Sequence, residues 1–470
     1  MSAEEADIVV IGMGPGGEDV AERLAEAGLS VVGVEGRLVG GECPYWGCIP
    51  SKMMIRAANL LAEGRRIPGM AGAAQVTPDW APVAQRIRKE ATDNWDDKVA
   101  VDRFVAKGGR FARGHGRITA PGEVTVSGPD GQGPPRVFRA RRGIVLNTGT
   151  DPAVPLIDGL AGTPYWTNRE AIETEQVPES LIVLGGGAIG AELGQVFARF
   201  GAAVTVVEAQ PGLLPMDEPE AGELLGKVFT AEGIAVWTGA GARSVSHDGT
   251  RFTVDVGGQA ITAERLLVAT GRRSDLAALG IGALGLDESA RTISVDDRMH
   301  AADGVWAIGD VTGKGAFTHI SMYQADIVVR EIVGKPGPAA DYRAVPRVTF
   351  TDPEIGSVGL TEAAAREQGL RVRTGFTRVP ESARGWIHKA GNDGFIKIVE
   401  DAERAVLIGA TSAGPVGGEV LSALVVAIHA EVPVSRLRSM IYAYPTFHRA
   451  IEDALCDLEA DERRRDPGRL

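Results

Sequence analysis

The pattern of apolar residues predicts a strand, a glycine-rich turn, a helix and a second strand at the start of the chain. A β-branched run over 7–11 is typical of a buried parallel strand. It leads through the glycine-rich stretch 12–17 into a helical pattern that ends at Gly28, and the next strand, 30–34, stops at Glu35. In this order of elements the glycines let the backbone approach a pyrophosphate at the helix N-terminus, and the acid binds a ribose hydroxyl. The glycines of this first G-x-G-x-x-G motif are Gly12, Gly14 and Gly17.

The same unit recurs later in the chain. An apolar strand over 181–184 leads into a second G-x-G-x-x-G motif, a helix and another strand that ends at Glu208. The separation from Gly12 to Glu35 is 23 residues (35 − 12), and that from Gly185 to Glu208 is also 23 (208 − 185). Two βαβ units in one register predict two dinucleotide sites in one chain. The glycines of the second motif are Gly185, Gly187 and Gly190.

Each unit is followed by an apolar strand that ends in Thr-Gly, at Thr148-Gly149 in the first copy and at 270–271 in the second. The distance from the first glycine to this Thr-Gly is 137 residues in the first copy and 86 in the second. The first copy therefore carries an insertion of 51 residues (137 − 86), and two neighbouring cysteines lie within it.

The remainder of the chain predicts one more domain. Residues 280–339 return to strand and helix patterns, and the strand over 304–310 ends on Asp310. The Gly- and Pro-rich run 334–338 predicts a linker, and mixed sheet and helix patterns follow it. We therefore expect an α/β protein with two Rossmann-like dinucleotide-binding domains and a C-terminal α+β domain. The expected boundaries are 1–150 with 280–339 for the first domain, 151–279 for the second and 340–470 for the third.

Composition narrows the class of protein. The chain has 470 residues, of which 44% are hydrophobic and 24% charged, which excludes a disordered or collagen-like chain. Lys and Arg number 49 against 62 Asp and Glu, and the net charge of −13 argues against nucleic acid or an anionic membrane surface as a partner. No apolar stretch reaches the roughly 18 residues of a membrane span, and the N-terminus lacks a signal-like pattern. We expect a cytoplasmic protein.

The most informative chemistry lies in a cysteine pair. Only three cysteines occur, and Cys43 and Cys48 are five residues apart. We predict that Pro50 is the first residue of a helix, which puts Cys48 at the helix N-terminus, where the dipole and free amides favour a thiolate. Lys52, one turn further on, adds positive charge. Because no further metal ligands of suitable spacing stand nearby, we expect no metal, and a redox pair is favoured over a buried structural one.

The segment from Gly41 through Cys43 and Cys48 to Ile-Pro-Ser-Lys52 resembles the redox-disulfide motif of class I pyridine nucleotide–disulfide oxidoreductases, the group of dihydrolipoamide dehydrogenase, glutathione reductase and mercuric reductase. The resemblance covers essentially the whole chain, including both glycine motifs, both Thr-Gly strands, 307–310 and 350–359. It implies FAD in the first unit and a nicotinamide cofactor in the second. It also implies that Cys48 faces the flavin and that Cys43 attacks the substrate.

The resemblance assigns further residues to the cofactors. Glu35 would bind the adenosine ribose of FAD, and Asp310 its ribityl chain. Lys52 would lie near flavin N5, paired with Glu192. His319 would belong to a flavin-contacting loop, where we favour a hydrogen-bonding scaffold role. The other positions that the resemblance assigns to cofactor binding are Gly41, Gly116, Thr148, Gly149, Gly271, Phe317 and Thr318.

Glu208 bears on the choice between NADH and NADPH. It shares its register with Glu35, which favours ribose recognition over a purely structural role at the strand end. An acid at this position repels a 2′-phosphate, and no Arg follows before Pro211. We therefore expect NADH to be preferred.

The chain departs from the family near its C-terminus, where a His-Pro-Thr-x-x-Glu motif supplies the acid–base histidine across a homodimer. Here Tyr444 stands in the histidine position and Arg449 in the glutamate position. A phenol with a pKa of about 10 is a poor base at neutral pH, although it is a serviceable hydrogen-bond donor. If Pro445 opens a helix, His448 and Glu452 form a similar pair displaced by one turn. The alternative, which we favour, is that His448 packs at the dimer interface.

Three functions fit these observations. The leading interpretation is an enzyme, a homodimer through residues 340–470, that passes electrons from NADH through FAD to a Cys43–Cys48 disulfide and on to a small or specialised disulfide. The second is an NADH:acceptor reductase that reduces quinone-like small molecules directly from the flavin. The third is an FAD-bound redox-sensing or partner-binding protein with little turnover. Cys456 stands alone, and the lack of a vicinal C-terminal pair argues against mercuric reductase.

Overall fold

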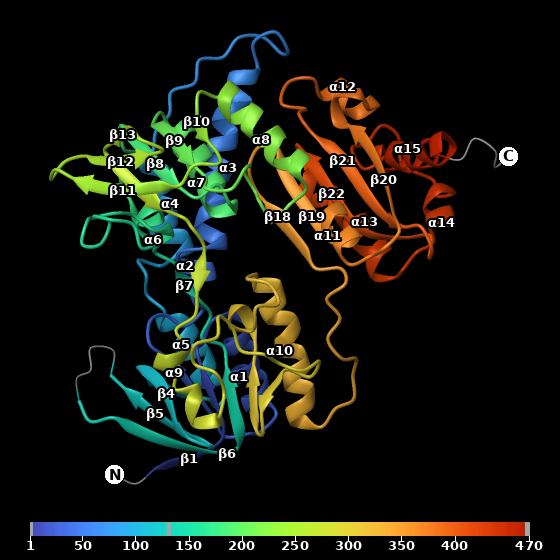
Figure 1. Ribbon diagram of the computed structural model, residues 1–470. Coiled ribbons are helices and arrows are strands. Elements are labelled where there is room, and N and C mark those ends of the chain that lie inside the picture. The colour runs from blue at the N-terminus through green and yellow to red at the C-terminus, as the bar shows by residue number, and fades with distance from the viewer. Residues whose placement is uncertain (1–2, 129–132, 466–470) are drawn as a thin grey trace. The chain divides into compact units, whose positions relative to one another are not determined.

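The computed structural model describes residues 3–128 and 133–465, and the chain folds into two compact units (Figure 1). The first unit combines the chain up to residue 50 with 85–153 and 272–342. The second combines 51–84, 154–271 and the chain from 343 onward. Each unit is therefore assembled from three separate stretches of sequence.

A mostly parallel sheet forms the centre of the first unit. Its strands, in spatial order, are β16 (His300–Ala302), β17 (Val305–Ala307), β6 (Arg136–Leu146), β1 (Glu4–Ile11), β2 (Val31–Glu35) and β3 (Arg110–Arg113). Neighbours in this order are parallel except β16, which is antiparallel to β17. A hairpin of β4 (His115–Ala120) and β5 (Glu123–Ser127) pairs with β6. A two-residue ladder joins β7 (Asp151–Pro152) to β15 (Arg272–Arg273).

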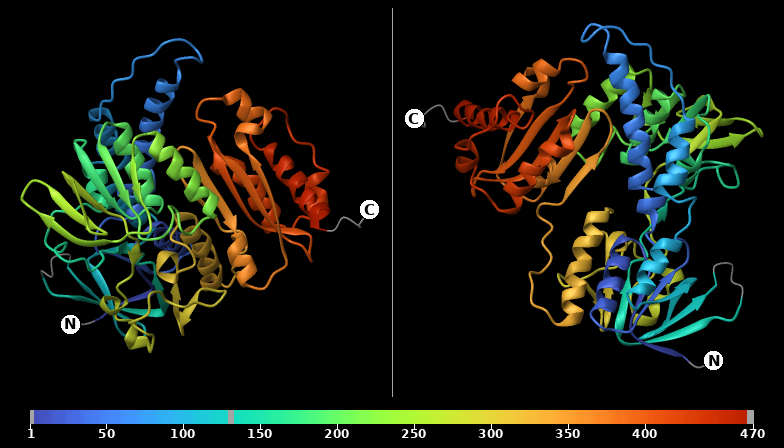
Figure 2. Two further views of the ribbon diagram at one scale, coloured as in Figure 1. Left: turned by 45° about the horizontal axis from the view of Figure 1, so that its top comes forward. Right: turned by 180° about the vertical axis from the view of Figure 1, so that it is seen from behind.

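Both faces of this sheet are covered, which explains the unbroken apolar run of the first strand. The helices α1 (Pro15–Glu26) and α10 (Thr318–Val333) lie side by side and bury Ile8 and Val10 of β1 (Figures 1 and 2). On the other face Val9 and Ile11 join a cluster with the β4–β5 hairpin and two short helices, α9 (Leu276–Leu279) and η2 (Ile281–Leu284). The remaining helices of the unit are α2 (Glu42–Tyr45), the π-helical η1 (Ile87–Ala91), α5 (Lys98–Ala106) and η3 (Gly309–Thr312).

The second unit repeats the first motif in a smaller parallel sheet. Its strands, in spatial order, are β10 (Ala235–Trp237), β9 (Ala203–Val207), β8 (Ser180–Leu184) and β14 (Arg265–Val268). Helix α7 (Ala188–Arg199) joins β8 to β9, and α8 (Pro219–Ala231) joins β9 to β10, so β8–α7–β9 reproduces β1–α1–β2. An antiparallel sheet of β11 (Ala242–His247), β12 (Phe252–Val256) and β13 (Gln259–Ala263) and the helix α6 (Asn168–Glu173) complete this part.

A five-stranded antiparallel sheet organises the chain from 343 onward. Its strands, in spatial order, are β18 (Pro346–Thr349), β19 (Glu354–Gly359), β22 (Val406–Gly414), β21 (Phe395–Asp401) and β20 (Val372–Arg378). Helices α13 (Gly417–His429) and α15 (Ala450–Arg465) bury their apolar side chains in one cluster with β19, β21 and β22. The shorter helices are α11 (Glu362–Glu367), η4 (Val379–Glu381), α12 (Ala383–His388) and α14 (Val434–Arg438).

The expected fold class is confirmed, with two dinucleotide-binding βαβ units and a C-terminal α+β part. One helix start differs from the prediction by two residues. Helix α3 (Cys48–Arg66) begins two residues before Pro50, which still lies in the first turn, where its missing N–H leaves no helical bond unmade. Helix α4 (Ala81–Arg86), like α3, runs across a division between the units.

The prediction that Pro445 opens a helix is wrong. Residues 444–449 form turns, and α15 begins only at Ala450. The Thr446 hydroxyl donates to the carbonyl of Ala443 at 2.7 Å, a local side-chain bond of the kind that competes with helical bonding. Among the described residues, no helix is long and apolar enough to cross a membrane.

Candidate functional site

The outer glycines of both G-x-G-x-x-G motifs are required by the packing of the chain itself. Gly12 has φ +89°, and a Cβ there would lie 2.3 Å from the carbonyl oxygen of Asn147. Gly185 has φ +106°, and its Cβ would lie 2.3 Å from the carbonyl oxygen of Ala269. A positive φ together with such a contact excludes any side chain. The third glycines are equally crowded, because Cβ atoms on Gly17 and Gly190 would lie 2.0 Å from the oxygens of Gly12 and Gly185.

The middle glycines are different. Gly187, the residue before α7, has φ −75° and ψ −175°, and no heavy atom lies within 4 Å of a Cβ built there. Gly14, the residue before α1, has φ −67°, and its nearest contact would be Asn147 Nδ2 at 3.2 Å. Neither strain nor crowding requires glycine at 187, so the open space suits a ligand that approaches the backbone closely. This is the fit expected for a dinucleotide pyrophosphate at a helix N-terminus.

The acids that end the second strand of each unit have the same surroundings. Each carboxylate accepts two backbone N–H bonds, one from its own glycine loop and one from two residues further along the chain. Burial raises the pKa of Glu35, and these N–H groups oppose the shift. The donors are Met13 and Arg37 for Glu35 (2.8 and 2.7 Å) and Gly186 and Gln210 for Glu208 (both 2.7 Å).

Asp310 lies in η3, directly after β17, and anchors a short chain of polar contacts in the first unit. It accepts a hydrogen bond from Thr150 Oγ1 at 2.9 Å, and Arg272 Nε donates to the same hydroxyl at 2.8 Å. Arg272 also lies 3.6 Å from Glu42. Burial raises the pKa of Asp310, against the effect of Thr150 and Arg272. The sequence analysis missed Thr150 and Arg272, although each directly follows a Thr-Gly, a signal that both copies share.

Asn147 is a second residue that the sequence analysis missed. Its side chain is buried, with Nδ2 donating to the Gly12 carbonyl at 3.3 Å and Oδ1 accepting from Ser321 Oγ at 3.1 Å. It therefore ties the first glycine loop to α10. The sequence feature that could have identified Asn147 is its position as a polar residue at the end of an otherwise apolar strand.

The two neighbouring cysteines contact each other in the first unit. Cys43 lies in α2 and Cys48 is the first residue of α3, and both are free thiols in this structure. The Cys48 thiol lies 3.6 Å from Thr318 Oγ1. The hydrogen bond with Cys48, and then burial, raise the pKa of the Cys43 thiol. A vicinal dithiol at a helix N-terminus is a suitable redox centre.

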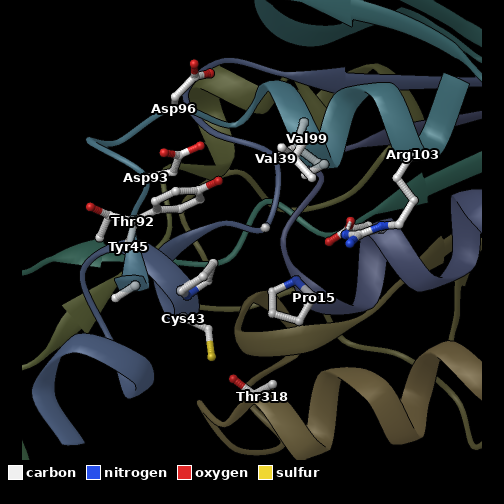
Figure 3. A pocket seen from close by; sticks show the side chains of 15 residues that line it. Pro15, Val39, Cys43, Tyr45, Thr92, Asp93, Asp96, Val99, Arg103 and Thr318 are labelled. Carbon is white, nitrogen blue, oxygen red and sulfur yellow. Dashed lines mark hydrogen bonds and ion pairs between the residues drawn. The ribbon is translucent and has the colours of Figure 1, made fainter. Parts of the chain in front are cut away.

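A cavity of about 460 Å³ borders Cys43 on the side of α1 and α5 (Figure 3). Its wall is formed by residues of α1, of the segment 39–45 and of the segment 91–103, together with Thr318 at the start of α10. Cys48 is not among the lining residues, so of the two thiols Cys43 is the one that borders this cavity.

In the second unit, Lys52 and Glu192 form an ion pair. Lys52 Nζ donates to Glu192 Oε2 at 2.8 Å, and the other carboxylate oxygen accepts from the backbone N–H of Phe350 at 2.8 Å. The lysine ammonium also lies 4.7 Å from the centre of the Phe350 ring. Glu192 is buried, and these contacts fix its carboxylate at the first turns of α7.

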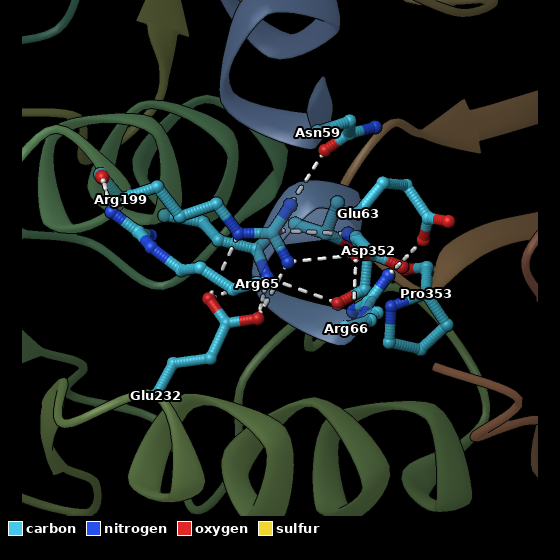
Figure 4. Close-up of polar contacts among 10 residues, drawn as sticks. Asn59, Glu63, Arg65, Arg66, Arg199, Glu232, Asp352 and Pro353 are labelled. Carbon is cyan, nitrogen blue, oxygen red and sulfur yellow. Dashed lines mark hydrogen bonds and ion pairs between the residues drawn. The ribbon is translucent and has the colours of Figure 1, made fainter. Parts of the chain in front are cut away.

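A buried ion network holds the chain next to this pair (Figure 4). Arg199, only 3% exposed, contacts Glu232 at 2.5 Å and Asp352 at 2.7 Å, and Arg66 contacts the same Asp352 oxygen at 2.7 Å. Gln195 donates to the Asp352 carbonyl and accepts from its N–H, at 2.9 and 2.8 Å. The network thereby secures the turn that follows Phe350 to helices α3 and α7.

The C-terminal segment brings together the residues that replace the family's His–Glu pair. Tyr444 is 71% exposed, and the Arg449 guanidinium lies 5.5 Å from the centre of its ring. Arg449 also pairs with Glu452 at 2.9 Å, whereas the His448 ring lies 6.2 Å from that of Tyr442. Within the described chain no hydrogen bond or ion pair joins His448 to Glu452, so the displaced pair that a helix at Pro445 would have made is not found.

The other predicted cofactor positions lie on loops of the two units. Gly41 has φ +68°, and a Cβ there would lie 2.8 Å from the Gly14 Cα, which keeps the cysteine segment close to the first glycine loop. The rings of Phe317 and His319 stack 5.1 Å apart, at the start of α10. Residues 116, 148, 149 and 271 lie on β4 or directly after β6 and β14. In the part of the chain that is described, no cluster of acidic, His and Cys side chains suits a metal ion.

Comparisons with known proteins agree with this arrangement. The family model for pyridine nucleotide-disulphide oxidoreductases matches residues 6–325, and the model for the dimerisation domain of that family matches 345–455. A dihydrolipoyl dehydrogenase of Chlorobaculum tepidum is 34% identical over 466 residues, 97% of each chain. A mercuric reductase of Shewanella putrefaciens is 30% identical and covers 95% of this chain and 80% of its own length.

A solved structure is similar over nearly the whole chain. It is the Cu(II) complex of the HOCl-induced flavoprotein disulfide reductase RclA from Escherichia coli, with a TM-score of 0.84 and 26% identity over 97% of this chain and 99% of that one. This chain is therefore an NAD(P)H-dependent flavoprotein oxidoreductase that binds FAD. It combines two dinucleotide units, a dithiol and a dimerisation domain. The chain belongs to the pyridine nucleotide-disulphide oxidoreductase family.

Proposed function

We propose that this enzyme reduces a small disulfide with electrons from NADH, through the dithiol of Cys43 and Cys48. The observation that carries the proposal is the contact between the two thiols together with the cavity that borders Cys43. When bound, FAD accepts a hydride from the nicotinamide and passes the electron pair to a disulfide. The residues that would hold it are the first glycine loop, Glu35 and Asp310.

The exchange itself needs only the two cysteines. The Cys43 thiolate attacks one sulfur of the substrate disulfide, the substrate S–S bond breaks, and the first product leaves as a thiolate that takes a proton from water. Cys48 then attacks the Cys43 sulfur of the mixed disulfide, releases the second thiol and closes the Cys43–Cys48 disulfide. A hydride equivalent from NADH, which supplies two electrons and one proton, together with one proton from water, restores the dithiol for the next turnover.

Glu208 supports NADH as the electron donor. Its carboxylate accepts the N–H groups of Gly186 and Gln210 in the same geometry that Glu35 has in the first unit. A carboxylate held there binds ribose hydroxyls and repels a 2′-phosphate. We therefore assign ribose recognition to Glu208 and Glu35, and the pair of Lys52 and Glu192 to holding a positive charge for the flavin.

We also propose that the enzyme is a homodimer through residues 340–470. Beside the exposed Tyr444, Met440 and Ile441 are 48% and 97% exposed in the single chain, and a second copy would cover such apolar side chains. Light scattering that gives the mass of two chains supports the homodimer, and an active monomer contradicts it. In the dimer Tyr444 would donate a hydrogen bond at the rim of the site, while water or the substrate takes the proton of Cys43.

A second function, an NADH:acceptor reductase for quinone-like molecules, is favoured by one observation. Tyr444 and Arg449 replace the His–Glu pair on which disulfide-reducing relatives depend, and electron transfer directly from a flavin needs no such pair. NADH oxidation by the holoenzyme with lipoamide, small disulfides and quinones, repeated with Cys43→Ser, separates the two functions. Loss of all disulfide reduction in Cys43→Ser supports the dithiol route. Quinone turnover that survives in the variant, without disulfide reduction by the wild type, refutes it.

A further inference from the structure

The cavity beside Cys43 is acidic. Its charged lining residues are Glu18, Asp93, Asp96 and Arg103, three carboxylates against one guanidinium. Figure 3 shows Asp93 next to Tyr45, Asp96 beyond Asp93, and Arg103 further along α5. A substrate that reaches Cys43 through this cavity therefore passes a wall of net negative charge.

The single cation of the wall is already neutralised. Arg103 forms ion pairs with Glu18 and, at 3.0 Å, with Glu22. Lys98, the next cation along the segment, is paired with Asp102. Asp93 and Asp96 are the acids of the lining that form no ion pair with Arg103.

Neither of those two carboxylates forms a side-chain ion pair with a cation among the described residues, although the charge of Asp96 acts on Lys98 and, after the hydrogen bond and charge of Asp102, helps to raise the pKa of that lysine. Asp93 is exposed, and its side chain has no hydrogen bond or ion pair there. Asp96 accepts only a backbone N–H, from Lys98 at 2.8 Å. Burial raises the pKa of Tyr45 to about 12, and the nearby charges of Asp97, Glu18 and Asp96 add to that shift.

An unusual backbone holds the acidic segment in place. The π-helical turn η1 is followed by three successive non-glycine residues with positive φ, Asp93 (47°), Asn94 (58°) and Trp95 (58°). The buried Thr92 fixes this turn, since its hydroxyl donates to the carbonyls of Ile87 and Arg88 at 3.1 and 3.2 Å. Such conformations cost free energy and persist where the surrounding structure enforces them. The cavity wall is thus a built feature of the chain.

We propose that this cavity selects disulfides that carry a positive charge near their sulfur atoms, such as aminoalkyl disulfides, and disfavours anionic ones. The inference rests on the proposed function, in which Cys43 exchanges with the substrate. An ammonium group that enters with the disulfide replaces part of its hydration by the carboxylates of Asp93 and Asp96, whereas a carboxylate on the substrate is repelled by them.

Three disulfides of similar size test the selection. Cystamine is cationic, 2-hydroxyethyl disulfide is uncharged and 3,3′-dithiodipropionate is anionic. We expect kcat/KM of the NADH-reduced holoenzyme to fall in that order, with at least about a tenfold ratio of cystamine to dithiodipropionate at low ionic strength. Added salt should shrink the ratio, because it screens exposed charges.

The double variant Asp93→Asn, Asp96→Asn should bring the ratio of cystamine to dithiodipropionate below about threefold. Asn tolerates the positive φ at position 93. At position 96 the side-chain oxygen of Asn can still accept the N–H of Lys98, so the segment keeps its shape. The matched control is Asp19→Asn, a carboxylate of α1 outside the cavity that pairs with Arg23, and it should leave the ratio unchanged.

The outcomes separate this inference from the function on which it rests. Equal kcat/KM for the three disulfides, or a ratio that the double variant leaves unchanged, overturns the charge selection while disulfide reduction stands. A wild-type enzyme that reduces none of the three and no lipoamide overturns the proposed function, and the selection with it.

Discussion

Replacement of Gly187 by alanine tests whether the second glycine loop binds a dinucleotide. Its φ of −75° and ψ of −175° are allowed for alanine, and no heavy atom lies within 4 Å of the new Cβ. The folded state therefore loses nothing, and the stiffer unfolded chain adds about 0.4–1 kcal/mol to the free energy of unfolding. We expect urea unfolding to show an unchanged or slightly raised midpoint.

Binding of NADH should weaken in the same variant. The methyl group fills the space through which a pyrophosphate reaches the N-terminus of α7, and each charge-assisted hydrogen bond lost there is worth about 1.5–3 kcal/mol. At about 1.4 kcal/mol per tenfold, the Kd for NADH, and the KM with it, should rise roughly 10- to 100-fold. Fluorescence titration with NADH and steady-state kinetics measure the two quantities.

Two further glycines of the second unit serve as controls. Gly226, within α8, is equally open, and alanine there should stabilise the chain by up to about 1 kcal/mol without changing the Kd for NADH. Gly190 is crowded, with the Gly185 oxygen 2.0 Å from its Cβ position, so alanine should cost about 1–3 kcal/mol. If Gly187→Ala leaves the free energy of unfolding unchanged and the Kd for NADH within twofold of the wild-type value, the open space does not receive the cofactor.

Four other predictions address the remaining features. Glu208→Arg should raise the NADPH-to-NADH ratio of kcat/KM at least about tenfold, because a guanidinium replaces the ribose-binding carboxylate; a wild type that prefers NADPH contradicts the assignment. Arg199→Met should lower the free energy of unfolding in urea by about 3 kcal/mol, since buried acids lose their partner, and a loss below about 0.5 kcal/mol would refute this. Lys397 forms ion pairs with Glu218, Glu220 and Glu362 at 3.0, 2.7 and 3.1 Å. Burial lowers the pKa of Lys397, but these carboxylates outweigh burial and raise it. The charge of Lys397 therefore stabilises the fold below the unfolded pKa of about 10.4, and this stabilisation fades as the pH rises through the raised folded value. The stability gap between wild type and Lys397→Met should therefore stay constant from about pH 8 to about pH 10 and narrow above about pH 10.4 in urea titrations. A gap that stays constant above about pH 10.4 counts against the ion pairs of Lys397. The double change Tyr444→His, Arg449→Glu should increase lipoamide reduction about 10²-fold or more and add an acidic limb near the histidine pKa of about 6.5, and an unchanged pH–rate profile would show that this segment supplies no base.

The sequence predicts the local part of this architecture well. The glycine motifs, the strands around them and the terminal acids lie close together along the chain, so their spacing alone determines the geometry. The equal separations from Gly12 to Glu35 and from Gly185 to Glu208 correspond to matching N–H contacts on the two carboxylates. The assignment of NAD and FAD roles to individual residues beyond these contacts stays a prediction.

The parts that the sequence does not predict depend on distant contacts or on local competition. Asn147 gains its role from Ser321, 174 residues away, and a side-chain pattern does not indicate such a contact. The acidic wall at Asp93 depends on a π-helical turn and positive φ values that ordinary residues rarely adopt. At Pro445 the helix-start rule fails, because Thr446 bonds back to Ala443.

The discontinuous make-up of the two units has a consequence for folding during synthesis. In the first unit β17 pairs with β6, but Val305 follows Leu146 by 159 residues (305 − 146). At a synthesis rate of about 5–20 residues per second, that edge of β6 waits roughly 8–30 seconds for its partner strand. An unpaired edge of apolar strand is a template for pairing with other chains. The nascent enzyme is thus most prone to aggregate while its second dinucleotide unit is being made, and chaperone binding in that interval should raise the yield of folded protein.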